Sequence, residues 1–444
     1  MAEVLVVGGG VAGLAAAHEA RRRGFEVRVL EAEARAGGVV HSERMDGFLC
    51  EEAANGFLDN TPGGAVDLCR ALGVELAAAN PAAKRRWLWR GDALHRVPAG
   101  PAILATRLLS TRAKLRALVE PLVRSKAEGD ESLSAFVRRR LGAEVADVFV
   151  QPLVTGIWAG DAERLSAAAA FPKVVELERR YGSLVRGLIA SRKNGARPMG
   201  GMLAPIGGTG ALVDALSREL GSRVETGARA EALEKAGRGF RLRLAGGATL
   251  EAERLVLACP PQAAGKILRP HDDALADLLA DTPYVGVAVV HVGIDAGRVR
   301  HPLDGFGFLV CPGETLRCLG CVFESSLWPA RAPEGRALLR LIYGGSRDPE
   351  APSLSDEALQ AAALADLGRS VGVSGTPSLV RVVRHARAIP QYVVGHLARV
   401  EEIERRAAAL GVVLAGSGYH GVSVNDCVKD AQRVAERLGP PEQP

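Results

Sequence analysis

Hydrophobic and polar positions along the chain follow two periods, and their order predicts an α/β protein. Residues 3–7 (EVLVV) form a short apolar run typical of a buried strand. This run leads into GGGVAG and then into an Ala-rich segment with the pattern of a helix that ends near Arg23. A second apolar run at 26–30 predicts the next strand, and Glu31 stands at its end. Strand, glycine-rich turn, helix and strand in this order predict a parallel βαβ unit.

The glycine-rich turn at residues 8–13 has the spacing of a dinucleotide-binding motif. Gly8 permits a tight turn, Gly10 lets the backbone approach a pyrophosphate, and Gly13 allows the helix to lie close to the sheet. The helix N-terminus offers free N–H groups to the phosphates. Glu31 is placed to accept hydrogen bonds from ribose hydroxyls, which favours an unphosphorylated ribose. The predicted ligand is therefore a dinucleotide.

A second glycine-rich turn, Arg35-Ala-Gly37-Gly38, follows Glu31 by a few residues. In NAD enzymes the chain usually continues here as an ordinary helix. The turn resembles that of FAD proteins of the glutathione-reductase and amine-oxidase type, in which it also cradles the dinucleotide. A plain surface turn is the alternative interpretation, because such short turns also arise by chance.

A long helical region is predicted from about 102 to 190, because apolar residues return there every three or four positions. The stretch 111–126 is basic and amphipathic, which is typical of a helix on a membrane surface or of a solvated face of a helical domain. Residues 155–161 (TGIWAGD) predict a glycine-bearing break inside this region.

The remaining segments predict a second sheet and a return of the chain to the first one. Residues 81–92 have the pattern of a hairpin arm with basic residues at its mouth, and strong alternation between 283 and 395 predicts an antiparallel sheet. The run at 255–258 indicates a buried strand that returns to the dinucleotide sheet, and 223–229 a further strand. Residues 411–414 predict a last core strand, followed by a glycine-rich turn and a closing helix.

Composition and charge exclude some classes of protein. The chain has 444 residues, 48% of them hydrophobic and 24% charged, so it can form two or three folded domains. A net charge of +5 is small for this length and argues against nucleic-acid binding driven by electrostatics. No uninterrupted apolar run has the length of a transmembrane helix, so any membrane contact is expected from one side only.

The seven cysteines form no regular framework, and a reducing cytoplasm fits this pattern best. Cys318 and Cys321 have CxxC spacing, but the chain holds no second pair and the surrounding residues alternate like a strand. Core packing is therefore favoured over a metal or redox role, and no metal site is predicted.

Taken together, these segments resemble one family over nearly the whole chain: protoporphyrinogen oxidase, the oxygen-dependent FAD enzyme of haem synthesis. The resemblance is carried by GGGVAGL with Glu31 and RAGG, and by KRRWLW, TGIWAGD, FGFLVCP, LGCVFESSLWPARAP, YGGSRDP, IPQYVVGH and GYHGVSVNDC. The last four blocks are more specific than the dinucleotide motif. They favour this family over monoamine oxidases and carotenoid desaturases.

The resemblance implies an α/β architecture with a discontinuous Rossmann-like FAD-binding domain, a mixed α+β substrate domain and an inserted helical domain of membrane-binding type. The implied boundaries are 1–80, 201–265 and 401–440 for the FAD-binding domain, 81–92 and 266–400 for the substrate domain, and 93–200 for the helical domain.

The resemblance further implies non-covalently bound FAD, held by the two glycine-rich turns, the turn at 53–56 and the last turn of the chain. The implied contacts are Gly8, Gly9, Gly10, Val11, Ala12, Gly13, Glu31, Ala32, Arg35, Gly37, Gly38, Val39, Ala53, Ala54, Asn55, Gly56, Ala230, Ser417, Gly421, Val422, Ser423 and Val424. Family members often have Gly-Pro-Asn-Ser where this chain has Ala53-Ala-Asn55-Gly56, so the local backbone at the flavin is expected to differ although Asn55 is retained.

The implied reaction is the oxygen-dependent, six-electron oxidation of protoporphyrinogen IX, with release of hydrogen peroxide. Flavin N5 takes the hydride, so no catalytic acid or base is implied. Arg86 is expected to pair with a propionate. The implied substrate contacts are Arg86, Asn55, Gly156, Ala159, Leu309, Val322 and Ile342. From the residues alone, the aliphatic ones read as core and Arg86 as a solvated charge.

Three alternatives stay open at this point. The chain could be another FAD amine oxidase or carotenoid desaturase, although its aromatic content of 4% is low for an amine site. It could prefer coproporphyrinogen III, for which Lys84 and Arg85 would suit the extra carboxylates. It could also be a porphyrin- or flavin-binding carrier without turnover. A cytoplasmic location is expected, and contact with the inner face of the cell membrane, a homodimer and a ferrochelatase that takes the product are left open.

Overall fold

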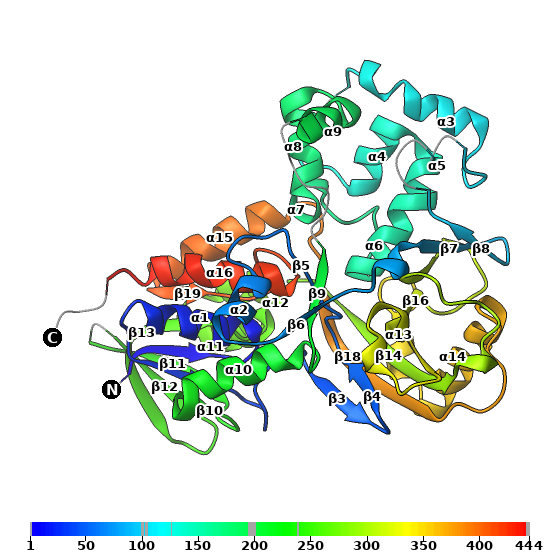
Figure 1. Cartoon of the computed structure of the whole chain (residues 1–444). Coiled ribbons are helices and arrows are strands. Elements are labelled where there is room, and N and C mark those ends of the chain that lie inside the picture. The colour runs from blue at the N-terminus through cyan, green and yellow to red at the C-terminus, as the bar shows by residue number, and fades with distance from the viewer. Residues whose placement is uncertain are drawn as a thin grey trace.

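The computed structural model describes residues 2–98, 102, 105–125, 127–193, 201–237 and 239–440. Within them the chain forms two seven-stranded sheets, two small sheets and a group of helices that stands above the second large sheet in Figure 1. The predicted α/β class is confirmed. The domain boundaries given above stay predictions.

The first large sheet, near both termini in Figure 1, is built from separate parts of the chain. β1 (Ala2–Val7) lies between β2 (Val27–Leu30) and β13 (Thr249–Leu257) and is parallel to both. The sheet also contains β10 (Val224–Glu225), β11 (Ala230–Ala236), β12 (Gly239–Leu244) and β19 (Val412–Leu414). The return of 255–257 to the first strand is confirmed, whereas the strand predicted at 223–229 is only two residues long.

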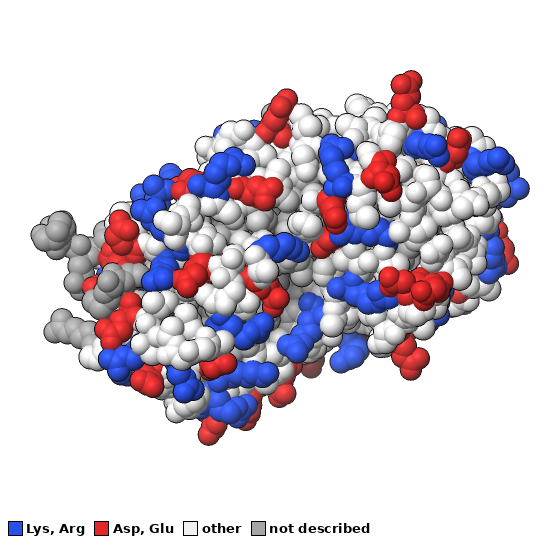
Figure 2. Space-filling model, turned by 90° about the horizontal axis from the view of Figure 1, so that it is seen from below, with Lys and Arg blue, Asp and Glu red and all other residues white. Residues whose placement is uncertain are grey.

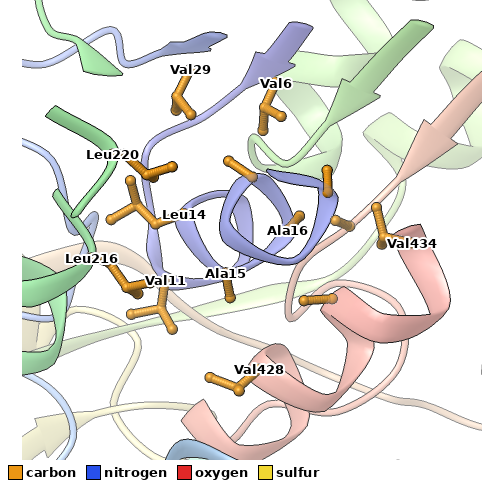
Figure 3. Close-up of a cluster of buried hydrophobic side chains, with 14 of the residues drawn as sticks. Val6, Val11, Leu14, Ala15, Ala16, Val29, Leu216, Leu220, Val428 and Val434 are labelled. Atoms are coloured by element: carbon orange, nitrogen blue, oxygen red, sulfur yellow. The ribbon is translucent and has the colours of Figure 1, made fainter. Parts of the chain in front are cut away.

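Helices cover both faces of this sheet. One face carries α1 (Val11–Arg22), α2 (Ala65–Ala71), α10 (Gly210–Leu220) and α16 (Val424–Arg437), and the other carries α11 (Pro261–Leu268), α12 (Asp273–Ala280) and α15 (His396–Ala409). Figure 3 shows α1 end-on, with Val6 and Val29 of the strands on one side and Val428 of α16 on another. The buried alanines of α1 are small, so the sheet and two neighbouring helices can all approach it closely.

The second large sheet has the order β18-β14-β17-β16-β15-β7-β8. Its strands are β7 (Arg86–Arg90), β8 (Ala93–Arg96), β14 (Tyr284–Asp295), β15 (Gly307–Val310), β16 (Gly320–Phe323), β17 (Arg336–Gly344) and β18 (Leu379–Pro390). All neighbours are antiparallel except β7 and β15. The predicted antiparallel sheet and hairpin arm are confirmed. One face packs against α14 (Asp356–Ser370), and Cys318 and Cys321 are buried in that core as predicted.

The helical group contains α3 (Thr111–Leu118), α4 (Leu133–Leu141), α5 (Ala143–Val145), α6 (Gln151–Trp158), α7 (Ala167–Ala170), α8 (Pro172–Tyr181) and α9 (Leu184–Lys193). Two details differ from the prediction. The helix predicted over 111–126 ends at Leu118, because Pro121 follows in a short 3-10 turn; Lys126 lies outside the described residues. The break predicted at 155–161 begins only after Trp158, where Ala159 adopts a left-handed conformation (φ 45°).

Two small sheets lie where the large ones meet. β3 (Ser42–Met45) pairs with β4 (Phe48–Glu51), and β9 (Met202–Pro205) pairs with β5 (Phe57–Leu58) and β6 (Leu76–Ala78). Residues 52–56 connect β4 to β5 and are therefore held between the two large sheets.

Acidic and basic side chains are interspersed over the face shown in Figure 2, without a large region of one sign. Among the described residues, none of the helices is both long enough and apolar enough to cross a bilayer.

Candidate functional site

The first glycine-rich turn is locked to the end of β2. The Gly9 N–H donates to Glu31 Oε2 (2.7 Å), and the Glu33 N–H donates to Glu31 Oε1 (2.8 Å). A carboxylate accepts about four hydrogen bonds. Glu31 therefore retains acceptor capacity for ribose hydroxyls while its position is fixed by the turn.

The glycines of this turn differ in the space around them. A Cβ on Gly13 would lie 1.9 Å from the Gly8 carbonyl oxygen, and one on Gly8 would lie 2.7 Å from the Ala258 carbonyl. A Cβ on Gly10 would meet nothing within 4 Å. Gly8 and Gly13 are thus required by packing within the protein, whereas Gly10 borders open space at the N-terminus of α1. This is the arrangement that a pyrophosphate requires.

The second glycine-rich turn lies directly beside the first. The Gly37 N–H donates to the Gly9 carbonyl oxygen (2.7 Å), and Gly37 pairs with Gly10 in an isolated bridge. Gly37 and Gly38 both have positive φ (111° and 59°), which favours glycine. The structure therefore brings the two predicted cofactor turns together, and an FAD molecule fits their combined backbone donors and open space.

Other predicted cofactor residues lie around these turns. Arg35 is paired with Glu52 (3.6 Å), and Val39 has 43% of its surface exposed. The chain reaches Ala230 two residues after Ala228, whose N–H donates to the Glu31 carbonyl oxygen (2.8 Å).

The last glycine-rich turn is tied to the rest of the protein by Tyr392. Its hydroxyl donates to the Ser417 carbonyl oxygen (2.6 Å) and accepts from the Gly421 N–H (2.6 Å). Ser423 and Asp426 then form a capping box that begins α16. The turn therefore ends at a helix N-terminus that is packed beside α1.

The predicted substrate residues occupy two neighbouring rows on one face of the second sheet. One row aligns Arg86, Gly307, Val322 and Arg340, and the next aligns Leu88, Leu309, Gly320 and Ile342. The alternate residues of these strands, such as Phe308 and Leu341, pack on the opposite face against α14. All four predicted strand residues therefore point to the face that α14 does not cover.

Helix α6 lies against the same face. A Cβ on Gly156 would come within 2.7 Å of Leu309 Cδ2, and Ala159 packs in a cluster with Ile342. The structure thus brings Gly156 and Ala159 to the predicted wall. Arg86 and Ile342 stay apart, because two strands separate them and three interstrand spacings amount to roughly 14 Å.

Arg86 differs from the adjacent Arg85 in having no acidic partner. Its side chain is exposed, with the guanidinium 5.2 Å from the centre of the Phe306 ring, and it forms no ion pair or hydrogen bond with any described residue. The adjacent Arg85 is paired with Asp304. Of these two arginines, only Arg86 is free to bind a carboxylate of a ligand.

The sequence interpretation missed a buried group of charges beside Asn55. Glu51, Glu324, Arg331 and Arg340 are each at most 4% exposed and are joined by ion pairs. A usable signal was present: Arg340 is a charged residue inside the apolar strand segment ALLRLIYG, and a buried charge requires a partner.

Comparison with known proteins agrees with this geometry. The family model described as "Flavin containing amine oxidoreductase" matches residues 11–439. The chloroplastic protoporphyrinogen oxidase of Oryza sativa subsp. japonica is 35% identical over 98% of this chain and 88% of its own. The coproporphyrinogen III oxidase of Bacillus subtilis is 30% identical over 96% of this chain and 95% of its own. A crystal structure from Exiguobacterium sp. 255-15, named as a candidate protoporphyrinogen oxidase, has a TM-score of 0.86 at 28% identity over 98% of both chains.

Proposed function

Because this chain belongs to the family of flavin-containing amine oxidoreductases, we propose that it is an FAD-dependent oxidase that converts a porphyrinogen to a porphyrin in haem biosynthesis. Relatives named protoporphyrinogen oxidase and coproporphyrinogen III oxidase align with it over nearly their whole lengths. FAD held by the two glycine-rich turns would supply a two-electron oxidant that oxygen regenerates, and three such rounds would account for the six electrons.

The observation that carries this proposal is the shape and charge of the sheet face that α6, and not α14, lies against. From Ile342 to Arg86 the two rows extend roughly 14 Å, and apart from the buried, ion-paired Arg340 they hold aliphatic residues and glycines up to the free guanidinium at one end. This suits a broad apolar ring that bears carboxylates on one edge. A small amine would contact only a fraction of it. We expect Arg86 to hold a propionate, while Leu309, Val322 and Ile342 hold the ring against the flavin and exclude water.

Of the two porphyrinogens, protoporphyrinogen IX fits the face better. It carries two propionates, whereas coproporphyrinogen III carries four and should require more free cations. Arg85 is occupied by Asp304, Arg90 donates to the Leu108 carbonyl oxygen (2.6 Å), and Arg340 is paired with Glu324. Of Arg85, Arg86, Arg90 and Arg340, only Arg86 is thus without a protein partner among the described residues, and Lys84 close to it in the chain is also unpaired, which supplies two free cations rather than four.

Rates with the two substrates test this proposal. We expect the purified protein to contain flavin, to be bleached anaerobically by protoporphyrinogen IX, and to consume oxygen faster with it than with coproporphyrinogen III. A higher coproporphyrinogen rate would reverse the substrate assignment. Flavin that neither porphyrinogen reduces would rule out the enzymatic function and leave a carrier.

We further propose that the helical group rests on a membrane surface. Leu115, Leu118 and Leu122 of the α3 region are 54% to 73% exposed, next to basic residues of the same segment. Replacing all three leucines by serine should abolish sedimentation with anionic vesicles while the flavin spectrum is retained. Equal sedimentation of both proteins would refute the proposal.

A further inference from the structure

We propose that Arg331 is a positioning residue for the flavin, because it holds the backbone turn at 53–56 so that its N–H groups face the cofactor. The inference rests on the proposed contact between this turn and FAD. It assigns a role to Arg331, which the predictions from the sequence did not include.

Arg331 is joined to both ends of this segment. Its Nη2 donates to Glu51 Oε1 (2.9 Å) and to the Asn55 carbonyl oxygen (3.0 Å), and its Nη1 donates to Glu324 Oε2 (2.6 Å) and to Asn55 Oδ1. The side chain is only 3% exposed. A planar guanidinium with five donors can make all of these contacts at once, and a lysine cannot.

The backbone carbonyl groups of residues 51–55 all accept hydrogen bonds from side chains. Those of residues 51, 52, 53, 54 and 55 are bonded by His291 (3.1 Å), His385 (3.0 Å), Arg340 (2.5 Å), Thr209 (3.2 Å) and Arg331 (3.0 Å), respectively. The segment is therefore fixed from its carbonyl side by residues of the second sheet and of the loops around it.

The N–H groups of the same turn behave differently. Those of Ala53, Ala54, Asn55 and Gly56 form no hydrogen bond with any described residue. Because Arg331 can only donate, it also fixes which end of the Asn55 amide faces it, and the buried Asn55 Nδ2 has no partner among the described residues. Of these donors Asn55 Nδ2 is buried, and buried donors are normally satisfied; the four backbone N–H groups belong to partly exposed residues and are open to a ligand. Together they point to an acceptor-rich ligand.

The flavin is the acceptor that the position favours. The turn follows β4, which pairs with β3, and β3 begins at Ser42, shortly after the second glycine-rich turn. On its other side, a Cβ on Gly56 would lie 3.0 Å from the ring of Trp328, which packs beside Val322. It thus lies between the cofactor turns and the substrate face. The isoalloxazine carries carbonyl oxygens and ring nitrogens and gains negative charge on reduction, and aligned N–H donors stabilise that charge.

The test measures the flavin without any porphyrinogen. We expect Arg331→Lys to weaken FAD binding by about tenfold, to shift the visible absorption bands and to lower the midpoint potential of bound FAD, because misplaced N–H donors no longer favour the reduced form. Arg340→Lys, which alters the bond to the Ala53 carbonyl, should shift the potential in the same direction and keeps the test open if the first variant does not fold.

Arg140→Lys is the matched control. Arg140 is also buried (1%), is paired with the buried Glu120 and donates to the Val123 and Gly182 carbonyl oxygens (both 2.9 Å), but it lies in the helical group. This control should lower the melting temperature and leave the flavin spectrum and potential unchanged. If Arg331→Lys and Arg340→Lys likewise lose only thermal stability, the positioning role is refuted. Because no porphyrinogen is present, either outcome is independent of the proposed reaction.

Discussion

Alanine substitutions at Gly13 and Gly10 should separate the protein's own packing from cofactor binding. In Gly13→Ala the new Cβ would lie 1.9 Å from the Gly8 carbonyl oxygen and 3.1 Å from Ala258 Cβ. In Gly10→Ala the new Cβ meets no protein atom within 4 Å, and Gly10 has the extended φ of −69° that alanine adopts freely. The two variants add the same methyl group at one turn of the chain.

The sizes of the two effects follow from these distances. The contact at Gly13 must open from 1.9 Å to at least 3.0 Å, so α1 has to move by about 1.1 Å from strands against which Leu14 and Ala17 are fully buried. Overpacking costs about 1–3 kcal/mol, and a contact of 1.9 Å with a backbone oxygen places this site at the upper end of that range. The helix propensity of alanine returns about 1 kcal/mol, so we expect a net loss of about 2 kcal/mol. Gly10→Ala should leave the stability of the FAD-free protein within about 0.5 kcal/mol. It should weaken FAD binding at least about tenfold, because the methyl group occupies the space where the backbone would approach the pyrophosphate.

Thermal unfolding of the FAD-free proteins and titration with FAD measure the two effects separately. Gly13→Ala should melt several degrees below the parent protein before any cofactor is added. Gly10→Ala should melt with the parent and differ only in the FAD titration. The reasoning is refuted if Gly13→Ala melts normally, or if Gly10→Ala binds FAD as tightly as the parent protein.

Three further changes have defined outcomes. Arg86→Ala should raise KM for protoporphyrinogen IX more than it lowers kcat, since the side chain anchors the substrate; Arg85→Ala, which removes an arginine already paired with Asp304, should change KM less, and equal effects would contradict the assignment. Gly156→Ala should raise KM as well, because its Cβ would displace Leu309 Cδ2 from 2.7 Å; an unchanged KM would place Leu309 outside the substrate wall. Glu404→Gln tests electrostatics: burial opposes ionisation, but hydrogen bonds from His420 and Arg437 outweigh it and lower the pKa of Glu404 to about 2. Because the pKa is lower in the folded protein, ionised Glu404 stabilises the fold at pH values above its ordinary pKa of 4.5. The substitution should therefore cost about 2–3 kcal/mol of unfolding free energy near pH 7, and the difference from the parent protein should shrink below pH 4.5 and vanish as the pH falls through 2. A difference in melting temperature that stays constant between pH 7 and about 3.5 would argue against this account.

The first unit of the fold could be predicted because its signals are local. A strand, its turn, its helix and the next strand lie within 30 residues, and the burial of each depends mainly on its own periodicity. The end of α3 at Leu118 was also predictable from Pro121, which lies three residues further along the chain. The left-handed Ala159 was not, since alanine carries no preference for that conformation and only the contacts of α6 with the second sheet hold it there.

The charges around Asn55 show most clearly what sequence reasoning lacks. Glu51, Glu324 and Arg340 come from three segments, and nothing in their spacing indicates that they share one buried site. A buried ion pair contributes little net stability compared with apolar packing of the same volume, yet losing one partner is expensive. Retaining four such charges is therefore poorly explained by stability alone. It is explained if their hydrogen bonds must fix an irregular backbone turn, because apolar side chains can fill that space but cannot orient a carbonyl group.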